Sequence, residues 1–209
     1  MNDRSIDLDE TRKARSARVH RVTKESNVEI AIDLDGTGIT AISTGLPFFD
    51  HMLSQLGRHG GFDLDVRVTG DLEVDAHHRV EDTGLTLGQA FAQALGDKVG
   101  IQRFASIALP LDEALVEVAL DCSGRPFLHY DVELGEERSP LGSPGFDPQL
   151  AEEFTRAFVT EAALTLHVEL RYGKNTHHII EATFKAIARA LRAAVRIEGT
   201  SLPSTKGVL

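Results

Sequence analysis

Two structural periods meet in residues 164–192, LTLHVELRYGKNTHHIIEATFKAIARALR, and together they indicate the fold class. The first eight residues alternate apolar and polar side chains, which is the period of a half-buried β-strand. From Phe184 onward, apolar side chains recur three and four residues apart, as on one face of an α-helix. A polar loop and the motif His177-His178-x-x-Glu181 join the two. The segment therefore predicts a strand, a loop, an HHxxE motif and a helix, in that order.

The same order occurs earlier in the chain. The strand pattern GFDLDVRV at 61–68 aligns with ALTLHVEL at 163–170, and a second HHxxE motif at 77–81 opens another helical pattern. In this self-comparison His51 falls opposite Glu153. Matching units in matching order indicate an internal duplication. We expect an α+β fold with a flexible arm at 1–17, a first half at 18–100 and a second half at 101–209.

Composition limits the possible partners. The chain has 209 residues and a net charge of −10, which disfavours nucleic acid and anionic membranes. No apolar run approaches the ~18 residues that a membrane span needs, and the polar N-terminus does not resemble a secretory signal. The single cysteine, Cys122, excludes an internal disulfide and fits a reducing compartment. We therefore expect a cytoplasmic protein that binds neither nucleic acid nor membranes.

The spacing within each motif suits metal binding. Residues four apart in a helix share one face, so the first histidine and the glutamate of a motif can bind one cation. The second histidine points about 100° away and is better placed for a second metal. His51 and Glu153 could each complete one shell. The predicted ligands are His51, His77, His78, Glu81, Glu153, His177, His178 and Glu181.

Imidazole and carboxylate ligands suit Mn, Fe or Zn. A single HHxxE can also be a helix start whose histidines lie in solvent, but two copies in matching contexts favour a metal site. Two other readings stay open. One is a two-metal hydrolase acting on a phosphate ester. The other is a metal-storage shell, although such proteins need four long helices and the alternating strands argue against them.

Several longer segments resemble one known family. They are FFDHMLSQLGRHGGFDL (48–64), GDLEVDAHHRVEDTGLTLGQA (70–90), DCSGRPF (121–127), residues 164–192 and LPSTKGVL (202–209). Together they resemble imidazoleglycerol-phosphate dehydratase, an enzyme of histidine biosynthesis, and the similarity runs from Arg18 to Leu209.

The resemblance implies a fold, a reaction and an assembly. Each half would be a four-stranded sheet with helices packed on one face. The reaction would be the dehydration of D-erythro-imidazole glycerol phosphate to imidazole acetol phosphate, with two manganese ions per active site. The subunits would form a homo-oligomeric shell of 24, with sites between subunits. One departure is Glu153, where the family leads us to expect a further histidine ligand. Its extra negative charge could change the metal affinity, or leave a member that assembles without activity.

The chemistry explains the need for metal and for carboxylates. Neither C–H bond at the reacting carbons is acidic, but a metal on the ring nitrogens favours the imidazolate. Electrons from that ring can expel the hydroxyl and leave a diazafulvene-like intermediate, from which a base removes a proton. The catalytic candidates are Glu25, preferred from the resemblance, and the metal-held carboxylates Glu81 and Glu181.

The substrate's phosphate needs locally gathered cations because the protein is acidic overall. A helix continuing from His51 would place His59 on the same side. The substrate-binding candidates, most of them implied by the resemblance, are Glu25, His51, His59, His77, Glu81, Arg103, Arg125, His177, Lys185, Ser204, Thr205 and Lys206. We set His20, His129 and His167 aside as surface or structural histidines.

Overall fold

The computed structural model describes residues 15–70, 75–135 and 139–209, and within them two halves share one topology. In the first half, strands β1 (Ser16–Val22), β2 (Ser26–Asp33), β3 (Thr40–Ser43) and β4 (Asp63–Gly70) form a sheet in the order β1-β2-β4-β3. In the second half, β5 (Phe104–Leu111), β6 (Ala114–Asp121), β7 (Phe127–Asp131) and β8 (Thr165–Tyr172) form a sheet in the order β5-β6-β8-β7. In both sheets the last two strands are parallel and the other neighbours antiparallel. The predicted α+β duplication is confirmed.

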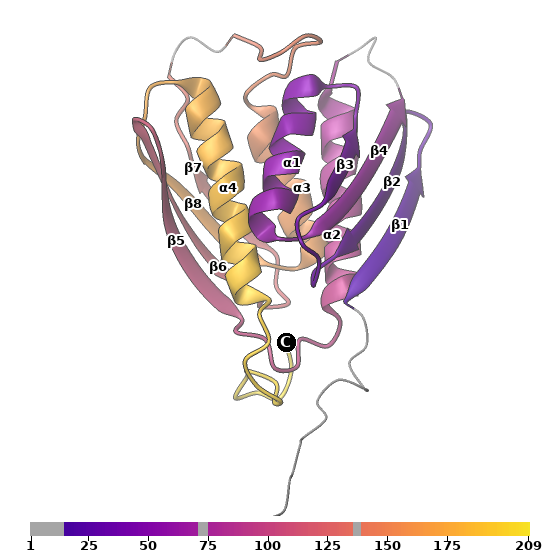
Figure 1. Ribbon diagram of the computed structural model, residues 1–209, viewed down its shortest axis with the longest axis vertical. Helices are drawn as coiled ribbons and strands as arrows, with labels where there is room; N and C mark the ends of the chain where they lie inside the picture. The colour runs from indigo at the N-terminus through magenta and orange to yellow at the C-terminus, as the bar shows by residue number, and fades with distance from the viewer. Residues whose placement is uncertain (1–14, 71–74, 136–138) are drawn as a thin grey trace, which may run out of the picture.

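Each half adds two helices after its third and fourth strands. The first half contains α1 (Pro47–Gly60) and α2 (His77–Leu95), and the second contains α3 (Leu150–Ala162) and α4 (Thr176–Ala194). The helices lie between the two sheets, so that each sheet has helices on one face only (Figure 1). The halves meet helix to helix, α1 against α4 and α2 against α3. None of the helices in the described ranges is long and apolar enough to cross a membrane.

The alternating strand patterns account for the core. Val28, Ile30 and Val66 of the first sheet, and Val168 of the second, are fully buried against the helices. Burying apolar side chains of this size contributes about 1.5–3 kcal/mol each. The alternate residues of the same strands face outward, which gives each sheet a polar outer surface.

The predicted N-terminal arm falls largely outside the described residues. Residues 1–14 are not described, whereas Ser16 and Ala17 already belong to β1 and pair with Asp33 and Ile32 of β2. The first strand therefore begins inside the segment that we expected to be an arm.

Two glycines let α2 approach α3 closely. A Cβ atom on Gly84 would lie 2.7 Å from the carbonyl oxygen of Phe154, and one on Gly88 would lie 2.6 Å from that of Phe158. These obstacles are backbone atoms, which cannot move aside as a flexible side chain can. The two helices therefore pack with almost no side-chain layer between them at this point.

We expect Gly88→Ala to destabilise the protein although alanine is the better helix former by about 1 kcal/mol. Overpacking against the α3 backbone should cost about 1–3 kcal/mol, and each kcal/mol lowers the melting temperature by roughly 2–4 °C in a protein of this size. Thermal unfolding measures the shift. Gly199→Ala is the control, because a Cβ atom there has no neighbour within 4 Å. Equal melting temperatures for the two variants would show that α2 and α3 can move apart at this contact without loss of stability.

Candidate active site

Polar residues before each motif place its histidines in the first turn of a helix. The side chain of Asn175 accepts hydrogen bonds from the backbone N–H groups of His177 (2.9 Å) and His178 (3.3 Å). Asp75 accepts one from the N–H of His77 (2.8 Å). Asn175 is the N-cap of α4, and both side chains satisfy N–H groups that have no partner inside the helix. The loops thus set where α2 and α4 begin, and with that the direction of the motif side chains.

The clearest cluster of possible metal ligands lies between α1 and α4. Nε2 of His51 is 3.2 Å and Nε2 of His177 is 3.0 Å from the same carboxylate oxygen of Glu181. One donor atom from each of the three residues lies within 4.8 Å of the others, and no other such group occurs among the described residues. The cluster joins the two halves, since His51 comes from the first half and the other two residues from the second.

Glu181 is held in its ionised form. Burial tends to raise the pKa of this carboxyl group, but hydrogen bonds from Lys185, His177 and His51 outweigh it and lower the pKa to about 2. The Lys185 ammonium lies 2.6 Å from the second carboxylate oxygen. The side chain of Glu181 is only 12% exposed, against 43% for His51. The charged carboxylate therefore lies on the buried side of the cluster, and the imidazoles lie on the side that faces solvent.

Further polar side chains of α1 extend the cluster through hydrogen bonds. The amide nitrogen of Gln55 lies 3.3 Å from Nδ1 of His51, and its oxygen lies 3.0 Å from Nε2 of His59. Partial burial, with Lys185 and Arg189 nearby, lowers the pKa of His59. His59 therefore lies on the cluster's side of α1, as its spacing from His51 suggested. Gln55 was absent from our candidates, although it lies one helical turn after His51.

The first motif is more open. Nε2 of His77 lies 3.7 Å from the carboxylate of Glu81, and the Glu81 side chain is 48% exposed, against 12% for Glu181. Helix α3, which carries Glu153, packs on α2 beside this motif. In the parts of the chain that the structure describes, Glu153 does not join His77 and Glu81 in a group as close as that around Glu181. Each HHxxE motif with its neighbouring ligands forms one half-site. The two half-sites are related by the duplication but differ in exposure and in how closely their ligands gather.

The second histidine of each motif turns toward a hairpin carboxylate. Nδ1 of His78 lies 3.6 Å from Glu25, and Nδ1 of His178 lies 2.7 Å from Glu113. Glu25 immediately precedes β2 and Glu113 immediately precedes β6, so the two glutamates are equivalent in the duplication. Glu25 was among the residues predicted from the sequence, whereas Glu113 was not. Extending the self-comparison back to the hairpin before each motif would have identified it.

The Glu113–His178 pair is electrostatically coupled. The hydrogen bond from His178 is the main cause that lowers the pKa of Glu113 to about 2, and backbone N–H groups add to it. The same hydrogen bond raises the pKa of His178.

The remaining substrate-binding candidates, apart from Lys185, lie at the opposite end of the molecule. The N–H of Arg103 bonds to the carbonyl of Ala194, in the last turn of α4, and its guanidinium bonds to the carbonyl of Pro203 and to Asp121 (all 2.7–2.8 Å). The first turn of α4, which holds His177, is roughly 25 Å away along the helix. Figure 1 shows the C-terminus at this far end of the helices. We call these residues the tail-end group: Arg103, Arg125, Ser204, Thr205 and Lys206.

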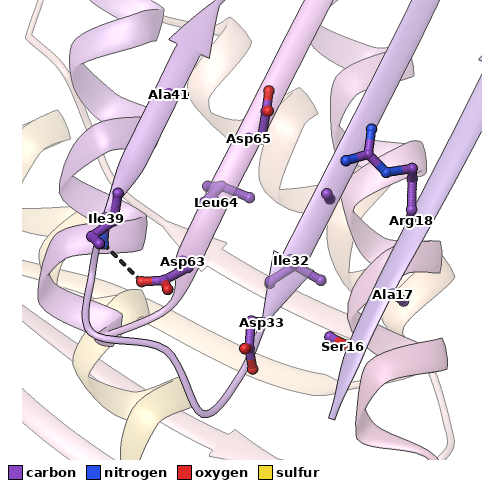
Figure 2. A pocket seen from close by; sticks show the side chains of 11 residues that line it. Ser16, Ala17, Arg18, Ile32, Asp33, Ile39, Ala41, Asp63, Leu64 and Asp65 are labelled. Carbon is purple, nitrogen blue, oxygen red and sulfur yellow. Dashed lines mark hydrogen bonds between the residues drawn. The ribbon is translucent and has the colours of Figure 1, made fainter. Parts of the chain in front are cut away.

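A separate hollow lies on the outer face of the first sheet and contains none of the predicted site residues. Figure 2 shows that most of its side chains come from the strands, with Arg18, Asp33 and Asp65 among them, while Ile39 comes from the loop before β3. At its edge, Asp63 accepts hydrogen bonds from the backbone N–H groups of residues 37–39, one of them drawn to Ile39. Asp63 therefore anchors the β2–β3 loop.

Known proteins share this sequence and this architecture. The family model for imidazoleglycerol-phosphate dehydratase matches residues 44–191. A protein of that name from Gluconacetobacter diazotrophicus is 55% identical over 199 residues, covering 94% of this chain and 98% of the relative. The relative from Acidothermus cellulolyticus is 54% identical over 200 residues and covers 95% of each chain.

Two solved structures of such enzymes have the same fold. The crystal structure from Staphylococcus aureus has a TM-score of 0.76 and 38% sequence identity, and covers 86% of this chain and 97% of its own. The crystal structure from Pyrococcus furiosus, in complex with (S)-C348, has a TM-score of 0.75 and 34% identity, and covers 91% of this chain and 100% of its own.

These relatives define the class of protein to which the duplicated fold and its histidine–carboxylate cluster belong: the chain is a hydro-lyase, an enzyme that removes water by breaking a carbon–oxygen bond. It belongs to the imidazoleglycerol-phosphate dehydratase family, which acts in histidine biosynthesis.

Proposed function

We propose that this chain dehydrates D-erythro-imidazole glycerol phosphate to imidazole acetol phosphate in the cytoplasm, with two manganese ions per site. The observation that carries the proposal is the cluster of His51, His177 and Glu181 between α1 and α4. A relative that had kept only the fold would have no reason to keep an ionised and largely buried carboxylate facing two imidazoles, because burying such charge is costly.

The spacing of the cluster fits a divalent cation. Two neighbouring ligands on an octahedral cation, with bonds of about 2.1 Å, lie about 3 Å apart. The two imidazole nitrogens lie 3.2 and 3.0 Å from the Glu181 oxygen. Imidazole with carboxylate is a donor set that suits manganese, iron or zinc. His51, His177 and Glu181 would hold one ion.

The second ion would be held by His77 and Glu81, with Glu153 contributed by the neighbouring α3. His78 and His178 point out of their own half-sites, which would let them complete a shell across a contact between subunits. A metal bound in this way supplies positive charge that favours the deprotonated imidazole ring of the substrate.

Glu25 is our candidate for the base. Its side chain is 58% exposed and lies 3.6 Å from His78, so it can reach a substrate held beside the first motif. As electrons from the ring expel the hydroxyl, the breaking C–O bond pair leaves with that oxygen, which becomes water on taking up a proton. Glu25 then removes a proton from the next carbon, and the C–H electron pair forms the enol that becomes the ketone. The phosphate takes no part in bond breaking.

The position of the tail-end group supports a site shared between subunits. Its cations lie roughly 25 Å from the motif histidines along α4, which is far longer than the small substrate. Of the cations that we predicted to bind the phosphate, Lys185 is the one beside the cluster, with its ammonium 2.6 Å from Glu181. We propose that the motifs of one subunit meet the tail-end group of another in a homo-oligomer, 24 subunits as the family resemblance implies.

Product analysis tests the proposal against a two-metal phosphate-ester hydrolase. The purified protein with manganese is incubated with imidazole glycerol phosphate, and both inorganic phosphate and the ketone product are measured. We expect imidazole acetol phosphate with its phosphate retained. Release of inorganic phosphate without a ketone would support the hydrolase instead.

A further inference from the structure

We infer that Glu113 is a positioning residue, which fixes the ring of His178 and leaves its Nε2 atom as the one that binds metal. The metal-binding part of this inference rests on the proposed function, whereas the orientation of the ring does not. We assign Glu113 no contact with the substrate. It acts through His178.

One carboxylate ties three segments together. An oxygen of Glu113 accepts hydrogen bonds from the backbone N–H groups of Lys174 (3.2 Å) and Asn175 (2.8 Å), in the loop before α4. Its other oxygen bonds to Nδ1 of His178 at 2.7 Å. Asn175 in turn caps α4 through the N–H groups of both motif histidines. The β5–β6 hairpin, the capping loop and the motif are thereby held in one arrangement.

This contact selects one tautomer of the imidazole. An ionised carboxylate can only accept a hydrogen bond, so Nδ1 of His178 must carry the proton. In a neutral ring the lone pair then lies on Nε2, which is the form that binds a metal. Asp112 lies 3.8 Å from Nε2, beyond hydrogen-bond distance, so that atom stays available. Carboxylates that orient metal-binding histidines in this way are a general feature of metal sites.

The equivalent pair in the first half behaves differently. Glu25 lies 3.6 Å from His78, and no backbone N–H group bonds to its side chain among the described residues. The duplication therefore supplies two related glutamates with different constraints. Glu113 is held in place by three hydrogen bonds, whereas Glu25 keeps the freedom that a base needs to approach a substrate.

Glu113→Gln separates the positioning role from the structural one. A glutamine oxygen can still accept the two backbone hydrogen bonds, but its NH₂ group would face Nδ1 of His178. That amide can only donate, so the ring must switch to the form with its proton on Nε2. We expect the variant to keep the wild-type melting temperature without metal and to bind manganese about 10- to 100-fold more weakly. Glu113→Ala should also lose stability, because it removes the anchor of the loop.

Two measurements make the test decisive. Nitrogen-15 NMR of histidine-labelled, metal-free protein reports the tautomer of His178, and a manganese titration with counted stoichiometry reports affinity. The control is Glu117→Gln, which alters a carboxylate of β6, the strand that Glu113 precedes, and whose partner is Arg171 on the outer face. Wild-type manganese affinity in Glu113→Gln, or an unchanged tautomer, would overturn the inference. Wild-type protein that binds no manganese would refute the proposed function instead, while the tautomer would still test the role of Glu113.

Discussion

Glu181→Gln will lose bound manganese and dehydratase turnover together. The amide keeps the size of the side chain but removes the negative charge that faces His51, His177 and Lys185. Loss of an outer partner of a metal ligand typically costs 10- to 100-fold in affinity or activity, so loss of a direct ligand should cost at least about 100-fold. Manganese content by elemental analysis and initial rates with imidazole glycerol phosphate measure both effects.

Glu161→Gln is the matched control for this substitution. Glu161 is also a helix carboxylate with a hydrogen-bonded partner, the side chain of Gln89 at 3.0 Å, but it lies in α3 and outside the candidate site. It should keep manganese and turnover at wild-type levels. If Glu181→Gln kept full metal occupancy and a normal rate, Glu181 would have no place in the site.

Two inactive variants should restore activity when they assemble together. One is Glu181→Gln, which damages the end of the subunit that carries the two HHxxE motifs, here called the motif end. The other is the double variant Arg125→Ala/Lys206→Ala, which removes two exposed cations from the tail-end group. Each charged hydrogen bond to a phosphate is worth about 1.5–3 kcal/mol, so the double variant should lose more than about 100-fold in kcat/KM. After mixing and reassembly, about one quarter of the sites should combine two intact contributions, if subunits associate at random.

A second mixture controls for nonspecific rescue. Glu181→Gln and His177→Ala both damage the motif end, so their co-assembly should restore nothing. Subunits mixed without prior dissociation should also stay inactive. Recovery in both mixtures, or in neither, would contradict a site built from the motif end of one subunit and the tail-end group of another.

Local patterns were sufficient to predict the fold. The alternation in β4 and β8, the helical period after each motif and their repetition in the same order depend only on neighbours along the chain. The pairing of helices across the halves was beyond such reasoning. Nothing in the helical period of α1 indicates that His51 faces Glu181 of α4, because this contact depends on how the two halves dock.

For the same reason, only part of the candidate site could be predicted from the sequence. The motif residues were found because helical spacing relates them directly. The hydrogen bonds of Glu113 to His178 and to the capping loop join segments that lie about 60 residues apart, so no local pattern reveals them. The distance between the motifs and the tail-end group was hidden likewise, since it follows from the length and direction of α4 in the folded chain.

We propose that this chain carries out a metal-dependent dehydration. The most direct test is turnover of imidazole glycerol phosphate by metal-stripped protein, measured with and without added manganese. We predict no product without metal and formation of imidazole acetol phosphate once manganese is restored. Manganese bound at two ions per subunit with no product would contradict the account, because the metal site would then serve another substrate or none.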